Sequence, residues 1–85
     1  MGVRLGEYLK ELRKDRGLGI SQVARKAGCT RSYLYLVERG KRDVSLRTLY
    51  CLVNAIGGDF NYALQLLALD AGVPPEALGL EKRKA

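Results

Sequence analysis

Apolar residues recur along the first part of the chain at spacings of three and four, which places them on one face of an α-helix. One such set precedes Gly17 and consists of Leu5, Tyr8, Leu9 and Leu12. A second set precedes Gly28 and consists of Ile20, Val23, Ala24 and Ala27. Because glycine readily takes the left-handed conformation that ends a helix, we expect two amphipathic helices that end at these glycines.

Three more helices are predicted by N-cap residues that precede apolar segments. Thr30, Ser45 and Asp59 carry side-chain oxygens that can accept hydrogen bonds from the first turn of a helix. The segments that follow them end at Gly40, at Gly57 and, after a helix over residues 60–71, at Gly72. The buried side is expected to be Leu34 and Val37 in the third helix, and Leu46, Leu49, Tyr50, Val53 and Ile56 in the fourth.

The chain lacks the signals of a β-sheet. No segment shows sustained two-residue alternation, and β-branched residues are sparse. We therefore predict an all-α fold with five helices in one domain over residues 1–72, followed by a C-terminal tail over residues 73–85.

Charge is divided unequally along the chain. Residues 1–47 carry 12 Lys and Arg against 5 Asp and Glu, whereas residues 48–80 carry three acids and no base. The whole chain has a net charge of +6. This division predicts a face for nucleic acid or an anionic membrane in the first half, and a packing or association surface in the second.

The side-chain inventory argues against an enzyme, a metal site and a cofactor. Histidine is absent, and Cys29 and Cys51 are the only cysteines, so neither a His-based triad nor a four-ligand zinc site can be assembled. We expect both cysteines to be small buried hydrophobes, and we expect no small-molecule ligand. The chain also has no signal-peptide stretch and no apolar run long enough for a membrane span, which favours a cytoplasmic location without membrane contact.

The second and third predicted helices have the residue pattern of a helix-turn-helix. Ala24 is small where the helices would cross, Gly28 stands where the chain must turn and a side chain would clash, and Cys29 is apolar at the corner. The seam between the two helices would be formed by Val23, Ala27, Leu34 and Val37.

The stretch from Gly19 to Arg42 resembles the lambda-repressor-like, Cro/C1-type (XRE family) DNA-binding domain, and the resemblance covers roughly residues 3–68. The segments that match the family pattern are Ser32–Leu34, Glu38–Gly40 and Ser45–Leu49. The resemblance implies a five-helix lambda-repressor-like bundle and a structural ion pair between Arg13 and Glu38. Where the family usually has Ser or Thr followed by a phosphate-binding Gln, this chain has Gly19 and Ile20, so we expect Ser21 or Gln22 to take the phosphate contact instead.

The third helix is expected to lie in the major groove of double-stranded DNA, with its first side chains at base edges. Arg31 is the strongest candidate, because a guanidinium can bond guanine O6 and N7 together; its alternative is a phosphate contact. Leu36 either meets a thymine methyl group or turns inward. The predicted base-reading residues are Thr30, Arg31, Ser32, Tyr35 and Leu36, and the predicted backbone contacts are Ser21, Gln22, Tyr33, Arg39, Lys41 and Arg42.

The fifth predicted helix is apolar on nearly every side and therefore needs cover on more than one face. We predict a homodimer through this helix and the tail, because a two-fold dimer would place two recognition helices about 34 Å apart. The alternative is a monomer in which the tail folds back over the helix. The predicted interface residues are Phe60, Leu64, Leu66, Leu67 and Leu69.

Together these features predict a sequence-specific transcription regulator, a repressor that occupies a palindromic operator. The competing hypothesis is a protein-interaction module, such as an antitoxin-like or accessory helical domain whose basic face binds an acidic partner.

Overall fold

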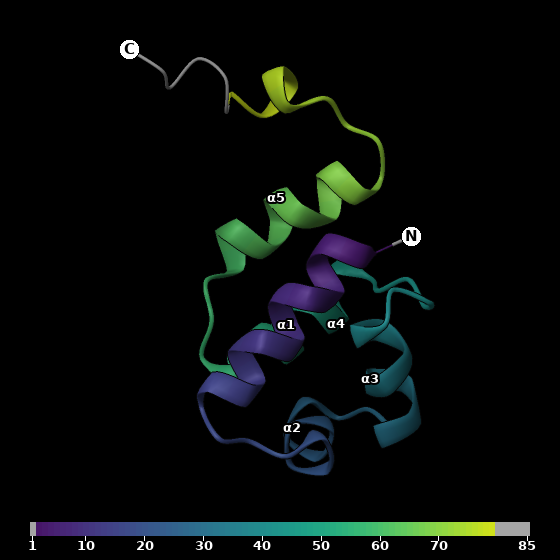
Figure 1. Ribbon diagram of the computed structural model, residues 1–85, viewed down its shortest axis with the longest axis vertical. Helices are drawn as coiled ribbons and strands as arrows, with labels where there is room; N and C mark the ends of the chain where they lie inside the picture. Colours follow the sequence, from purple (N-terminus) through teal and green to yellow (C-terminus); the bar gives the residue numbers. More distant parts are fainter. Residues whose placement is uncertain (1, 80–85) are drawn as a thin grey trace.

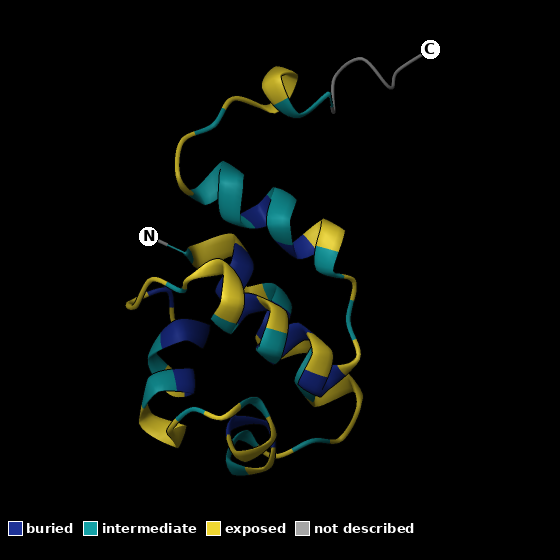
Figure 2. Ribbon diagram, turned by 180° about the vertical axis from the view of Figure 1, so that it is seen from behind, coloured by how far each residue is buried: buried dark blue, intermediate teal, exposed yellow. Residues whose placement is uncertain are grey.

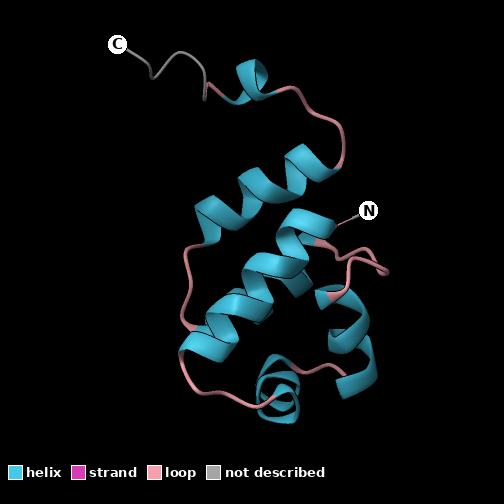
Figure 3. Ribbon diagram, viewed as in Figure 1, coloured by secondary structure: helices cyan, strands magenta, loops and turns pink. Residues whose placement is uncertain are grey.

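The computed structural model describes residues 2–79, and within that range every regular element is a helix (Figure 3). The prediction of an all-α fold with five α-helices is confirmed. The elements are α1 (Val3–Asp15), α2 (Ile20–Ala27), α3 (Arg31–Glu38), α4 (Leu46–Ile56), α5 (Phe60–Asp70) and a short 3₁₀-helix, η1 (Pro75–Leu78), which was not predicted.

The predicted caps form as expected. The side chains of Thr30, Ser45 and Asp59 each accept a hydrogen bond from the backbone N–H three residues later, at 3.0, 3.1 and 3.2 Å. Gly28 and Gly57 take left-handed φ values of 80° and 88° at the ends of α2 and α4. The helix boundaries are therefore set by residues next to them in sequence.

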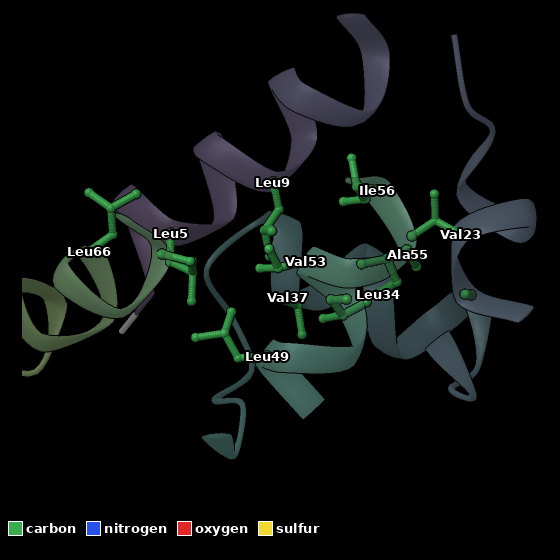
Figure 4. Packing of buried hydrophobic residues seen from close by; sticks show 13 residues of the cluster. Leu5, Leu9, Val23, Leu34, Val37, Leu49, Val53, Ala55, Ile56 and Leu66 are labelled. Atoms are coloured by element: carbon green, nitrogen blue, oxygen red, sulfur yellow. The ribbon is translucent and has the colours of Figure 1, made fainter. Parts of the chain in front are cut away.

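The helices pack around one core. In Figure 1, α1 crosses the centre of the molecule, with α5 on one side of it and α2 and α3 on the other. Figure 4 shows side chains from all five α-helices converging. The largest fully buried side chains of this core are Leu5, Leu9, Val23, Leu34, Leu49, Leu52 and Val53.

The buried face of α4 differs from the prediction. Leu46 and Tyr50 are 61% and 54% exposed, while Leu52 and Ala55 are buried. Both the predicted and the observed sets satisfy helical spacing, so the pattern alone did not fix the rotation of α4. Leu46 opens the helix at the rim of the core, and the Tyr50 ring packs edge-on against Phe60 at a centroid distance of 5.5 Å.

The segment after α5 leads away from the helices. In Figures 1 and 2, η1 stands beyond α5 along the long axis of the molecule, and none of its residues is buried. The described part of the tail therefore does not fold back over α5. The remainder of the predicted tail, residues 80–85, lies outside the described residues.

No helix between residues 2 and 79 is both long and apolar enough to cross a membrane. In this part of the chain, no three Cys, Asp or Glu side chains are grouped as ligands to one metal ion would be.

Candidate nucleic-acid interface

Helices α2 and α3 meet through a turn of three residues. Gly28 ends α2 with a φ of 80°, and Thr30 is the N-cap residue of α3. Ala24 is buried at 2% exposure, and Cys29 packs partly buried against the core, as the motif requires. One predicted reason was wrong: a Cβ atom at Gly28 would meet nothing within 4 Å, so it is the positive φ and not a clash that favours glycine there.

The outward face of α3 is the side opposite its buried residues. Leu34 and Val37 are 0% and 2% exposed and point into the core. At 100° per residue, Arg31 lies at the edge of the opposite arc of the helix, and Ser32, Tyr35 and Leu36 lie within it. The first three are exposed and Leu36 is half-buried, so α3 presents its predicted base-reading side chains at the surface.

The exposed charges of this region have one sign. Between residues 30 and 42, every exposed charged side chain is basic, namely Arg31, Arg39, Lys41 and Arg42. Two of these arginines stack on tyrosines. The guanidinium carbon of Arg39 lies 5.1 Å from the centre of the Tyr35 ring, and that of Arg42 lies 5.4 Å from the Tyr33 ring. These cation–π contacts restrain two cations beside the outward face of α3.

Tyr33 links α3 to the loop that follows it. Its ring is half-buried against the core, and its hydroxyl donates a 3.0 Å hydrogen bond to the carbonyl oxygen of Asp43. Burial raises the pKa of the Tyr33 phenol, against a smaller opposing effect of Arg42. The Tyr33 hydroxyl therefore supports the loop between α3 and α4, and its predicted contact with the DNA backbone stays a prediction.

The start of α2 is capped by its own third residue. The Oε1 atom of Gln22 accepts a 3.2 Å hydrogen bond from the backbone N–H of Gly19, while the Gln22 side chain remains exposed. This capping role was missed, although a Gln three residues after the N-cap is its sequence signal. The Gln22 amide N–H₂ remains available to a phosphate, and the half-buried Ser21 lies beside it.

An ion pair fixes the far end of α3. Arg13 on α1 holds both carboxylate oxygens of Glu38, with Nε–Oε2 and Nη2–Oε1 distances of 2.7 and 2.9 Å. Arg13 also donates a 3.0 Å hydrogen bond to the carbonyl oxygen of Leu18. The hydrogen bond to Glu38 raises the pKa of Arg13, and burial opposes it. The contact implied by the resemblance therefore joins α1, α3 and the loop before α2.

A hollow borders the outward face of α3 and was not foreseen. It has a volume of about 430 Å³ and is lined by Ile20, Arg31, Ser32, Tyr35 and Leu36. Ile20 was expected only in the core; it packs there partly buried, and it also forms one wall of this hollow. The start of α2 and the first turns of α3 thus share one concave surface.

Comparison with known proteins identifies this arrangement. The helix-turn-helix domain family matches residues 4–59. The chain belongs to this family, in its XRE, Cro/C1-like branch. It is similar in structure to the restriction-modification controller protein C.AhdI from Aeromonas hydrophila, with a TM-score of 0.69 and 37% identity over 73% of this chain and 90% of that one.

Curated relatives are named as transcription regulators. The chain is 42% identical to the immunity repressor protein of Bacillus phage phi105 over 62% of its own length and 37% of that protein. It is 40% identical to the transcriptional regulator DdrOP3 of Deinococcus deserti over 65% of its length and 43% of that protein. An uncharacterised regulator of Sinorhizobium fredii, y4dJ, is 36% identical over 62% of this chain and 69% of that protein. The chain thus spans less than half the length of two of these relatives.

Proposed function

We propose that this chain is a DNA-binding transcription regulator whose α3 helix enters the major groove. The observation that carries the proposal is the outward face of α3, where Arg31, Ser32 and Tyr35 are exposed while the opposite face is buried. A helix held in this way can present side chains to base edges without losing core contacts. The regulator names of the relatives, none of them an enzyme, favour the same function.

The base-reading set that we propose is Thr30, Arg31, Ser32, Tyr35 and Leu36. Arg31 is the main contact because it is an exposed guanidinium near the start of α3. The phosphate contacts that we propose are Ser21, Gln22, Tyr33, Arg39, Lys41 and Arg42. The Tyr33 hydroxyl also supports the loop that carries the last two residues.

We also propose that two copies bind one palindromic operator. The partner surface, called the α5 face below, consists of the partly exposed apolar side chains Phe60, Leu64, Leu67 and Leu69. At 100° per residue, Phe60, Leu64 and Leu67 lie along one flank of the helix and Leu69 lies on the other flank. Leu66, which was predicted to lie in this interface, is only 8% exposed and belongs to the core, because it points from α5 toward the other helices (Figure 4). Residues 73–79 lead away from α5 (Figure 1), and we propose that the tail, residues 73–85, joins the interface.

The dimer is tested by changing the α5 face without disturbing the core. Leu69 is partly exposed and lies outside the set of residues packed on the core, so Leu69→Glu should give a folded monomer. Asn54→Glu, at an exposed position of α4 outside the α5 face, is the control and should remain a dimer. Analytical ultracentrifugation of both variants decides the question; a wild-type monomer at all concentrations would refute the dimer.

DNA binding is tested by titration with random duplexes at several salt concentrations. If a dimer makes roughly eight phosphate contacts, log affinity should fall against log salt with a slope of about −7. Salt-independent or absent binding would refute the function and favour the protein-interaction module. Repression by operator occupancy predicts that the protein lowers transcription from a promoter that overlaps its selected site.

A further inference from the structure

We propose that the hollow between α2 and α3 reads the 5-methyl group of thymine. This inference rests on the proposed DNA binding and adds a specific base feature to it. It starts from the walls of the hollow: Ile20 and Leu36 are aliphatic, and Tyr35, which is 50% exposed, also lines the hollow. Arg31 and Ser32 supply the polar part of the lining.

Leu36 is the residue that points to a ligand. It is half-buried, yet it lies outside the set of apolar residues that pack on the core. Leu36 lines the hollow instead. A leucine in this position, on the face that α3 turns outward, gains contact area only if something apolar is placed against it.

The major groove offers one apolar group that fits this requirement. Adenine, guanine and cytosine present hydrogen-bond donors and acceptors there, whereas thymine also presents its C5-methyl group. A polar base edge pressed against Leu36 and Ile20 would lose its hydrogen bonds to water without replacement. The hollow therefore favours thymine by contact with the methyl group and disfavours the other bases by desolvation.

Arg31 lies beside the apolar residues of the hollow, so hydrogen bonding to a base and contact with a methyl group would take place next to each other. Its side chain lines the same hollow, so its guanidinium and the apolar walls reach the groove together. Arg31 can bond a guanine in the same stretch of groove that holds the thymine. The operator is thus expected to contain, in each half-site, a thymine whose methyl group is required and a guanine near it.

The test removes the methyl group and nothing else. A binding site is first selected from a random pool of duplexes, and each thymine in it is then replaced singly by deoxyuridine. We expect one position in each half-site at which wild-type affinity falls about four-fold, the effect of burying one methyl group. The variant Leu36→Ala should bind thymine and deoxyuridine duplexes equally at that position.

A matched control separates the hollow from leucine truncation in general. Leu46 is 61% exposed at the start of α4 and does not line the hollow, so Leu46→Ala should keep the four-fold difference. Circular dichroism confirms that both variants fold. The inference is overturned if the selected site lacks thymine, if no deoxyuridine replacement matters, or if Leu36→Ala keeps the difference. Each of these leaves the proposed function standing, whereas the absence of any selected site and of salt-dependent binding refutes the function itself.

Discussion

The Asp70 carboxylate caps the first turn of α1, with its Oδ2 atom 3.0 Å from the backbone nitrogen of Leu5. Its Oδ1 atom accepts from the backbone and the guanidinium of Arg4, at 3.2 and 3.1 Å. Helix α1 has no local side-chain cap, because its N-cap residue is Gly2. The last residue of α5 therefore supplies the capping group that the start of α1 lacks, and this joins the two helices at that end.

Removal of the Asp70 carboxylate should destabilise the domain. Asp70→Ala leaves two backbone N–H groups of α1 without their acceptor, and we expect a loss of about 1–2 kcal/mol in the free energy of unfolding, measured by urea denaturation. Asp70→Asn retains an acceptor oxygen and should lose less. Asp15→Ala, an exposed acid on α1, is the control and should not reduce stability; equal losses in Asp70→Ala and Asp15→Ala would contradict the capping role.

Removal of only one partner of the Arg13–Glu38 ion pair should strongly reduce the stability of the domain. The Arg13 and Glu38 side chains are only 11% and 4% exposed, so Glu38→Ala leaves a guanidinium largely out of water without its partner. We expect a loss of about 3–5 kcal/mol in thermal or chemical unfolding. The double variant Arg13→Met, Glu38→Leu should be more stable than Glu38→Ala, because neither charge is left without its partner. If the double variant instead loses as much stability as Arg13→Met and Glu38→Leu lose separately and in sum, the two residues are not coupled.

Gly6 should not tolerate alanine, although alanine is the better helix former. A Cβ atom at Gly6 would lie 2.6 Å from the carbonyl oxygens of Val37 and Glu38, where α1 crosses the end of α3. We expect Gly6→Ala to reduce stability by about 1–3 kcal/mol, as overpacking does. Gly19→Ser, at an N-cap with no neighbour within 4 Å, is the glycine control and should be neutral or slightly stabilising. A stabilised Gly6→Ala variant would show that the two helices can separate freely.

Arg31 and Lys41 should differ in what their loss does to DNA binding. Arg31→Ala should reduce discrimination between the selected site and its single-base variants by about 1–3 kcal/mol at one position. Lys41→Ala should weaken binding to all duplexes alike and flatten the salt slope by about one for each contact removed. Fluorescence anisotropy with matched and mutated duplexes measures both effects. The same loss of base preference in both variants would rule out this division of roles.

Cys29 should be a slow nucleophile near neutral pH. Burial raises the pKa of its thiol, with a smaller contribution from Cys51. Because the folded state holds the Cys29 proton more tightly than the unfolded chain, this thiol destabilises the fold only as pH rises above the ordinary cysteine pKa. In the variant Cys51→Ser, the pH profile of Cys29 alkylation should have its midpoint above that of free cysteine. A midpoint at or below the free value would show that burial does not control this thiol.

Much of this protein can be predicted from short stretches of sequence. The caps Thr30, Ser45 and Asp59 and the turn at Gly28 act on backbone groups within a few residues, so nearest neighbours determine where the helices begin and end. The residues that define the helix-turn-helix, the small Ala24, the turn residue Gly28 and the apolar Cys29, also lie within one short segment of the sequence. The resemblance gave the Arg13–Glu38 contact, which crosses 25 residues and would not follow from spacing alone.

The remaining features depend on where the helices cross. Spacing allowed two faces of α4, and only its packing against the other helices exposed Tyr50 and buried Leu52. The cap of α1 by Asp70 joins groups 65 residues apart, and the hollow that Ile20 forms with α3 depends on how α2 and α3 are placed relative to each other. The sequence by itself determined the helices and the motif, because those interactions are local. Tertiary structure decided which faces are buried and which residues share a surface, because that depends on the relative placement of whole helices.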